Sequence, residues 1–350
     1  MSFFEIINEQ TINQDDSAFP TLVKLDNGDI VCAFSVGGGP EVTGGSYCIV
    51  SKDNGASWSE KICILPRQEN PTRVNSMRLT RNSESRLIAY GQVNYMDSDN
   101  TKFGTLENEA VFCTSVDNGK TWASPSLVNH EYDCPLEVSN PMVVIADNRW
   151  LAPAAILTDS EHLGEKVVVK ESSDEGKTWN NEYIVFSSPE RNRGFFEQKI
   201  IETTANKLLA FSWTVTLPDY SDCNNHFAWS QDGGRTWNQP VDSGIQGQTL
   251  TPFWLGDNKF LLIYNYRKSP QGIRLAYAEI DDCKCNIIRD EYLWSPENSH
   301  NQSSKDGIDS FDDFAFGLPS ILRLDDQEFL AVFWCKENDS FGIKTIKFKL

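Results

Sequence analysis

The chain has 350 residues, of which 39% are hydrophobic and 11% aromatic, and its formal net charge is −19. This composition is typical of a protein with a folded core, and the length suits one large repeat domain. The acidic balance without a basic stripe excludes nucleic acid as an expected partner. No apolar run approaches the roughly 18–20 residues of a membrane-spanning helix, and no signal peptide is recognisable, so we expect a cytoplasmic protein.

The first predicted element is a short strand from Phe3 to Ile7. After it, one pattern recurs along the chain: an apolar strand, a tight turn rich in Asp, Asn and Gly, and a second apolar strand. This pattern is typical of a β-hairpin. Its six copies occupy residues 19–34, 76–90, 141–155, 196–213, 249–264 and 318–334.

A second motif, Ser-x-Asp-x-Gly-x-(Thr/Ser)-Trp, follows four of the hairpins. Its copies are residues 51–58, 115–122, 172–179 and 230–237. In the second copy, we expect Asp117 to accept hydrogen bonds from the backbone of its own turn and Gly119 to adopt a positive φ. Trp122 should fill the gap to a neighbouring unit. Four Asp residues in one repeated turn are predicted to be structural, not catalytic.

Each hairpin is followed by further strand-like segments, which gives units of four strands. The last unit lacks its fourth strand, and the strand from Phe3 to Ile7 is left over at the other end of the chain. The sequence therefore predicts an all-β, six-bladed β-propeller with four-stranded antiparallel blades, formed by residues 1–350 as a single domain. The N-terminal strand is expected to close the last blade. A two-sheet sandwich would not explain six matched hairpins.

The predicted strand order also indicates where a site can lie. In a four-stranded meander the first and third turns share one end, and here these are the tight hairpin turns and the Asp motifs. The long segments belong to the opposite end: residues 36–46, 92–109, 158–165, 215–225 and 297–316. Because binding and catalytic residues concentrate on loops held by a rigid scaffold, we expect the site at this loop-bearing end.

The Asp motifs and hairpins together resemble the sialidase superfamily, whose repeats are called Asp boxes or BNR repeats. The resemblance covers essentially the whole chain and implies the propeller fold. Three further strings look like a bacterial sialidase-like branch: residues 244–249, 264–274 and 316–320. Since one fold hosts several chemistries, the resemblance does not by itself establish the activity.

Sialidases bind the sugar carboxylate with three Arg, attack with a Tyr assisted by a Glu, and use an Asp as acid/base. The resemblance places Ala18 where the first Arg belongs, Gly44-Gly45-Ser46 at the Asp, and the Tyr at or next to Leu318, where residues 317–319 contain no Tyr. The second Arg, expected near 224–226, is also absent. These differences argue against hydrolysis of common sialosides.

Other positions match the sialidase pattern. Arg267 or Arg274 could match the third Arg, and Glu197, which opens the fourth hairpin, could match the Glu. A glycosidase needs one carboxyl group that protonates the leaving oxygen and a second that attacks or activates water. The separation of the two, roughly 5–5.5 Å or 6.5–9.5 Å, decides between retention and inversion. Sequence does not give that distance.

The loop-bearing end carries candidates for both roles. The candidate catalytic acids are Glu197, Asp16, Asp312 and Asp313. The candidate substrate-binding residues are Arg73, Arg78, Arg191, Gln248, Tyr266, Arg267, Arg274 and Trp213. Each has a structural alternative: a solvated loop charge for the acids, a bridge between blades for the Arg residues, and blade core for Trp213.

Two functions remain open at this stage. One is an exo-acting glycoside hydrolase on a carbohydrate other than the common sialosides. The other is a non-catalytic, lectin-like propeller that binds glycans or proteins. No cofactor is expected, and no metal site is predicted because Cys283-Lys284-Cys285 has no matching His or Cys cluster. The expected partner is an oligosaccharide or glycoside. The sugar, its linkage and the oligomeric state stay open.

Overall fold

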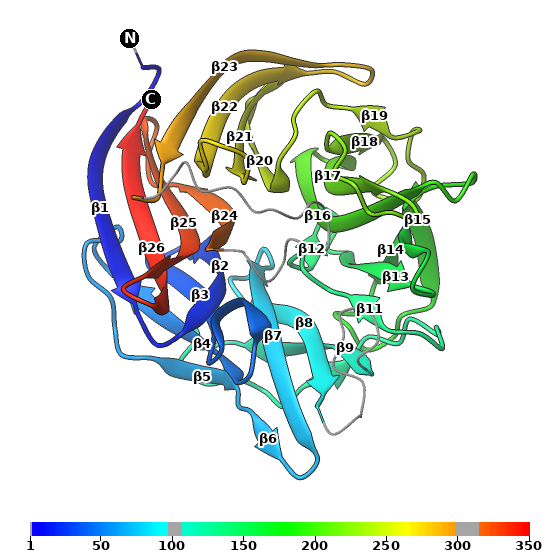
Figure 1. The fold of residues 1–350 in the computed structure, drawn as a ribbon. Helices are drawn as coiled ribbons and strands as arrows, with labels where there is room; N and C mark the ends of the chain where they lie inside the picture. The colour runs from blue at the N-terminus through cyan, green and yellow to red at the C-terminus, as the bar shows by residue number, and fades with distance from the viewer. Residues whose placement is uncertain (1, 97–106, 298–314) are drawn as a thin grey trace. The chain divides into compact units, whose positions relative to one another are not determined.

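The computed structural model describes residues 2–96, 107–297 and 315–350 (Figure 1). Its regular elements are β-strands, apart from one short 3₁₀ turn, η1 (Gly39–Glu41). The described ranges contain no helix long and apolar enough to cross a membrane. The strands form six antiparallel sheets, which are the blades of a six-bladed β-propeller. The predicted fold class is confirmed.

The chain divides into two compact units: residues 1–129 with 318–350, called unit 1, and residues 130–317, called unit 2. Unit 1 contains blades 1, 2 and 6. Blade 1 consists of β2 (Ser17–Lys24), β3 (Ile30–Val36), β4 (Gly45–Ser51) and β5 (Ile62–Leu65). Blade 2 consists of β6 (Gln68–Glu69), β7 (Thr72–Arg81), β8 (Leu87–Tyr95), β9 (Asn108–Ser115) and β10 (Ser126–Leu127). Blade 6 consists of β24 (Phe316–Arg323), whose first two residues are counted with unit 2, β25 (Glu328–Glu337), β26 (Ser340–Lys349) and β1 (Glu5–Asn13).

The N-terminal strand closes blade 6, as predicted. Strand β1 runs antiparallel to β26, with Glu5 opposite Lys349 and Asn13 opposite Ile343. The ring of Phe4 packs edge-on against that of Phe348, with centroids 5.9 Å apart. The two ends of the chain therefore belong to one sheet (Figure 1).

Unit 2 contains blades 3, 4 and 5. Blade 3 consists of β11 (Leu136–Glu137), β12 (Val143–Val144), β13 (Trp150–Leu157), β14 (Leu163–Ser172) and β15 (Asn181–Ser187). Blade 4 consists of β16 (Arg193–Thr204), β17 (Lys207–Thr216), β18 (His226–Ser230) and β19 (Val241–Asp242). Blade 5 consists of β20 (Gln248–Gly256), β21 (Lys259–Tyr266), β22 (Gly272–Ile280) and β23 (Cys285–Trp294).

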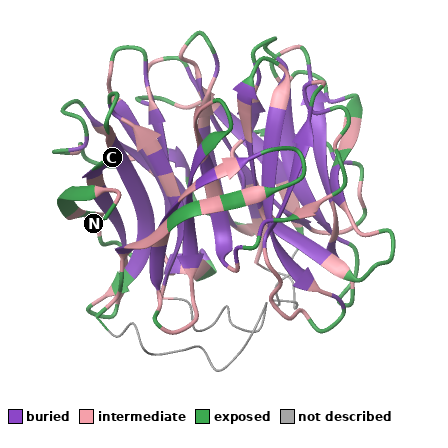
Figure 2. Cartoon of the chain, turned by 90° about the horizontal axis from the view of Figure 1, so that it is seen from above, coloured by how far each residue is buried: buried purple, intermediate pink, exposed green. Residues whose placement is uncertain are grey.

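The middle strands of the blades are buried on both faces. Every residue of β13 is buried, and Figure 2 shows buried strands with exposed turns at their ends. Between blades 4 and 5, Phe211 and Phe227 of one sheet pack against Leu262 of the other. A strand covered on both faces reads as a continuous apolar run, which is why the central strands do not alternate in sequence.

The Asp motif is a closed turn in the structure. In the second copy, Asp117 Oδ1 accepts the backbone N–H of Thr121 at 2.9 Å, and Oδ2 accepts the Thr121 hydroxyl at 2.6 Å. Gly119 has φ 83°, and Trp122 packs against the core shared by blades 1 and 2. The hydroxyl of Thr121 is the largest cause that lowers the pKa of Asp117, to about 2. This aspartate is therefore committed to its turn.

The Asp motifs and the first hairpin turns share one end of their blades. In blade 4, Gly233 of the motif donates its backbone N–H to the carbonyl of Asn206 in the first turn, at 2.8 Å. The start of β16 lies at the other end, because Arg193 pairs with Thr216 just before the loop from β17 to β18. Residues early in β16 consequently lie toward the loop-bearing end of unit 2.

Candidate functional site

Two neighbouring inner strands of unit 2 carry a β-bulge near their loop-bearing ends. In β16, Phe196 pairs with Trp213 and Lys199 with Phe211, which leaves two residues opposite one. Strand β20 has a register shift between Gln248 and Leu250. The bulged residues are Glu197, with φ 47°, and Thr249, with φ 48°. Such backbone costs about 1–3 kcal/mol, and bulges often re-aim side chains beside functional sites.

The two bulged residues contact each other. The Thr249 hydroxyl donates a hydrogen bond to Glu197 Oε2. The backbone N–H of Glu197 donates to Glu137 Oε2 at 3.2 Å. Glu137 ends β11 and is 7% exposed, whereas Glu197 is partly exposed. Two carboxyl groups are thus anchored on adjacent inner strands, of blades 3 and 4.

A cation accompanies this pair. The guanidinium of Arg267, just beyond β21, lies 5.1 Å from the ring centroid of Phe316, and its Nε has no access to solvent. Desolvation lowers the pKa of Arg267 to about 9, and the negative charges of Glu197 and Asp222 oppose this shift. Arg267 therefore stays positively charged at neutral pH, in the field of two carboxylates.

A third carboxylate is held by the blade core. Asp222 Oδ1 accepts the indole N–H of Trp213 at 2.9 Å. Trp213 is only 2% exposed and packs against the ring of Phe196, with centroids 5.6 Å apart. Its ring thus belongs to the blade core and orients Asp222.

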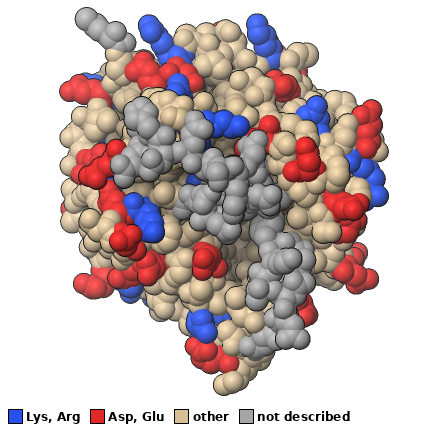
Figure 3. All heavy atoms as spheres, viewed as in Figure 1, with Lys and Arg blue, Asp and Glu red and all other residues tan. Residues whose placement is uncertain are grey.

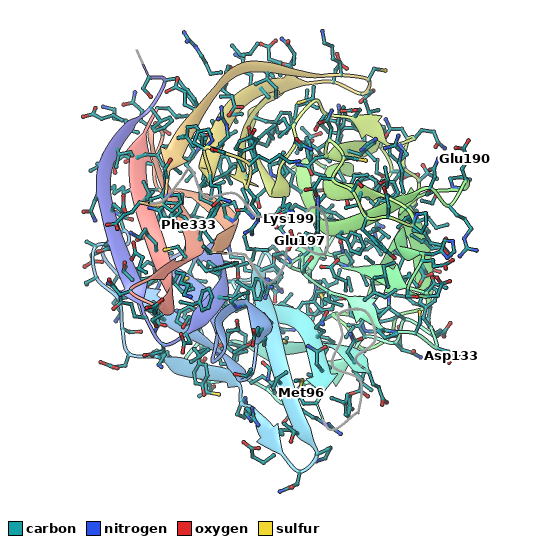
Figure 4. The ribbon with its side chains drawn as sticks, in the orientation of Figure 1. Met96, Asp133, Glu190, Glu197, Lys199 and Phe333 are labelled. Atoms are coloured by element: carbon teal, nitrogen blue, oxygen red, sulfur yellow. The ribbon has the colours of Figure 1, made fainter. Side chains whose placement is uncertain are left out.

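Charge alone would not have selected these groups. The chain has 50 Asp and Glu residues, and Figure 3 shows acidic side chains spread over the face it displays. Figure 4 shows Glu197 and Lys199 together on the inner strand of blade 4, whereas Asp133 and Glu190 lie at the periphery of unit 2. The contacts of Glu137 and Glu197 distinguish them from the solvated acids.

The sequence can now be placed in a family, because a BNR repeat-like domain matches residues 67–274. The chain belongs to the BNR repeat-like family. No curated protein is detectably similar in sequence to this BNR repeat-like chain.

Solved structures share its fold. A protein of unknown function from Dyadobacter fermentans is 20% identical over 100% of both chains, with a TM-score of 0.79. Trypanosoma rangeli sialidase is 15% identical over 97% of this chain and 56% of its own, with a TM-score of 0.61. A Penicillium chrysogenum α-L-arabinanase complexed with arabinobiose is 12% identical over 97% of this chain and 98% of its own, with a TM-score of 0.65. At these identities the likeness concerns the fold.

Among the substrate-binding residues predicted from sequence, two accompany those already described. Gln248 precedes Thr249 in β20 and is 5% exposed, and its Oε1 has no hydrogen-bond partner among the described atoms. Tyr266 ends β21 beside Arg267 and is partly exposed. Gln248 and Tyr266 are therefore chain neighbours of Thr249 and Arg267, the two residues that interact with Glu197.

Two predicted Arg residues of this BNR repeat-like chain have other partners. Arg274 Nε donates to Asp290 Oδ1 at 2.9 Å, and its guanidinium lies 4.4 Å from the ring centroid of Tyr292, within blade 5. Arg191 is exposed on a loop, where its Nε donates to Glu165 Oε2 at 2.7 Å. These contacts fit the structural alternative.

The candidates in unit 1 are described separately. Asp16 is exposed, and its Oδ1 accepts the backbone N–H of Phe341 at 3.2 Å. Its carbonyl accepts the N–H groups of Gly37 and Gly39 at 3.0 and 2.8 Å. Asp16 therefore organises two loops of unit 1.

The two Arg candidates of unit 1 stack on aromatic rings. Arg78 is 3% exposed, lies 4.9 Å from the ring centroid of Phe19 and donates to Ser76 Oγ at 2.6 Å. The guanidinium of Arg73 lies 4.5 Å from the ring centroid of Tyr95. Both cations are thus packed against side chains of their own unit.

Asp312 and Asp313 lie outside the described residues. In the sequence Glu137 stands with Glu131 and Asp133 among the acids that precede the third hairpin, but it was not selected as a catalytic candidate, and neither were Asp222 and Thr249. Glu137 had one available signal, since it is a lone acid within the otherwise apolar run Leu136-Glu137-Val138. In the described part of the chain, no three His, Cys, Asp or Glu side chains group in a way that would hold a metal ion.

Proposed function

We propose that this protein is a glycoside hydrolase whose catalytic pair is Glu137 and Glu197. One observation carries the proposal: the bulged Glu197 gives its backbone N–H to the Glu137 carboxylate, while its own carboxylate is held by Thr249. Two carboxyl groups fixed on neighbouring strands are what glycoside hydrolysis requires. The shared fold of the sialidase and the arabinanase supports the same class of reaction.

The surroundings of the two carboxyl groups suggest that they have different roles. The hydroxyl of Thr249 and the positive charge of Arg267 both stabilise a negative charge on Glu197. Glu197 is therefore proposed as the ionised group, which attacks the anomeric carbon or activates water. Glu137 is more deeply buried, and burial favours the neutral acid, although the N–H of Glu197 favours the ionised form. We assign Glu137 the role of the acid that protonates the leaving oxygen.

The proposed substrate is a carbohydrate other than a common sialoside. At the positions where the sialidase resemblance expects an Arg and the nucleophilic Tyr, the chain has Ala18 and Leu318, which are 0% and 3% exposed. The arabinanase complexed with arabinobiose matches this chain over nearly the full length of both proteins. Arabinosides therefore belong in the first set of substrates to be tested, beside uronic-acid glycosides and sialosides as comparison.

The test is a screen of the intact protein against aryl glycosides and oligosaccharides with product analysis. Glu137→Gln and Glu197→Gln should each lower kcat by about 10²–10⁴-fold, the usual contribution of a positioned acid or base. Glu190→Gln is the matched control, because Glu190 lies at the periphery of unit 2 (Figure 4). Glycan binding without turnover across the whole panel would instead identify a lectin-like propeller and refute the proposal.

A further inference from the structure

A buried lysine lies beside the two glutamates. Lys199 follows Glu197 by two positions in β16 and is 6% exposed. Its Nζ donates a hydrogen bond to the carbonyl of Ser139 at 3.0 Å. Ser139 in turn follows Glu137 by two positions. The chain segments that carry Glu137 and Glu197 are therefore joined twice, once through Lys199 and once through the N–H of Glu197.

The segment held by Lys199 lacks ordinary strand pairing. In blade 3, Glu137 pairs with Ala155, and pairing resumes only where Val143 meets Leu151. Residues 138–142 thus face the shorter stretch 152–154 of β13. Glu137 itself is the last paired residue of β11, and contacts from the neighbouring blade hold the interrupted segment that directly follows it. Lys199 supplies such a contact at the beginning of the interruption.

The side chain that makes this contact is charged, although it is buried. Burying an ammonium group costs free energy, which its contacts, the carbonyl of Ser139 among them, must offset. Lys199 is two residues from Glu197 in the sequence, and its ammonium group bonds the carbonyl of Ser139, which is two residues after Glu137. Its charge can therefore influence the proton balance of the pair as well as its spacing.

We infer that Lys199 is a positioning residue, which keeps the Glu137 carboxyl at the backbone N–H of Glu197 and supplies positive charge to the pair. This inference rests on the proposed function for its catalytic consequence. Its structural half, that Lys199 maintains the contact between Glu137 and Glu197, is independent of any activity.

The kinetic test compares Lys199→Met with Lys199→Arg. Lys199→Met should lower kcat about 10- to 100-fold, the range expected from the roughly 1.5–3 kcal/mol of a hydrogen bond to a charged group. KM should change less than threefold, and the pH profile of kcat should shift. Lys199→Arg retains a cationic donor and should recover part of the rate. Lys207→Met is the control, because Lys207 begins β17 at the opposite end of blade 4 and lies over Trp229.

Hydrogen exchange of the Glu197 amide provides the readout that needs no substrate. In Lys199→Met this amide should exchange at least tenfold faster than in the wild type, while in Lys207→Met it should not change. If the exchange is unchanged, or if Lys199→Met lowers only the melting temperature and keeps kcat and its pH profile, the inference is overturned. Faster exchange in a protein without glycosidase activity would refute the proposed function and leave the positioning role standing.

Discussion

Thr249 offers a sharp test of how Glu197 is held. Its hydroxyl donates to Glu197 Oε2, and the residue is 1% exposed. Thr249→Val removes the hydroxyl and keeps the shape of the side chain. Both residues are β-branched, so the strain of φ 48° is similar in the two proteins. The substitution therefore isolates one hydrogen bond.

The expected size of the effect follows from the environment of Glu197. A hydrogen bond to a charged group contributes about 1.5–3 kcal/mol, which corresponds to about 10- to 100-fold in rate. Because Glu197 is partly exposed, water can replace part of the lost interaction. We therefore expect kcat/KM to fall about tenfold. Loss of the donor disfavours the ionised carboxylate, so the acidic limb of the pH profile should move to higher pH.

The assay is the initial rate on the best aryl glycoside across the acidic to neutral range, with the melting temperature recorded for each variant. Thr249→Ser keeps the hydroxyl and should retain more activity than Thr249→Val. A Thr249→Val protein with kcat/KM within twofold of the wild type and an unmoved acidic limb would refute the assigned role of this contact. It would also remove one reason for assigning the ionised state to Glu197.

Three further predictions concern the scaffold. Asp117, whose pKa is lowered to about 2, stabilises the fold above the unfolded pKa of about 3.9 and loses this effect as the pH falls toward 2; Asp117→Asn should melt lower than wild type at pH 7, and an equal difference at pH 2.5 would contradict this. Burial, with a smaller effect of Lys170, lowers the pKa of His130 to about 3, so stability should decline as the pH falls from about 6.5 toward 3. This slope should weaken in His130→Phe, as scanning fluorimetry would show, and an unchanged slope would count against the assignment. Phe211→Ala should cost about 3–5 kcal/mol in urea unfolding, because Phe211 is fully buried between blades 4 and 5; a loss below about 1 kcal/mol would contradict that packing.

The fold was predictable because its signals are local. The hairpin turns and the Asp motifs are fixed by residues within eight positions of one another, as the bonds from Asp117 to Thr121 show. Even the closure of blade 6 by β1 followed from counting strands, because the last predicted unit had only three strands and the N-terminal strand belonged to no other unit. Turn residues and the number of strands can be recognised in a single sequence without information on tertiary contacts.

The site was less predictable because its contacts are tertiary. Glu197 was selected from sequence as a catalytic candidate, but Glu137, one of several acids before the third hairpin, and Thr249, which both contact it, were not. Their contribution depends on β-bulges and on contacts with the neighbouring inner strand. Neither feature is visible in the hydrophobic pattern of strands that are buried on both faces. For the same reason Trp213 was selected as an aromatic platform and Arg274 as a match to the sialidase pattern, although the structure gives them partners within their own blades.

The bulges also explain why the family resemblance specifies the fold more firmly than the chemistry. Positive φ angles recur near the beginning of four inner strands in the described part of the chain, at Phe19 in β2, Glu197 in β16, Thr249 in β20 and Leu318 in β24. The backbone distortion therefore belongs to the scaffold, and the side chain placed on it decides what each blade contributes. In unit 1 these side chains are apolar, and the sequence resemblance predicts the position of the sialidase nucleophile at or next to one of them, Leu318. In unit 2 they are a carboxylate and a hydroxyl that bond to each other. A scaffold that re-aims one residue on several of its inner strands can thus carry different side-chain chemistry after single substitutions, without any change in its turns or strand order.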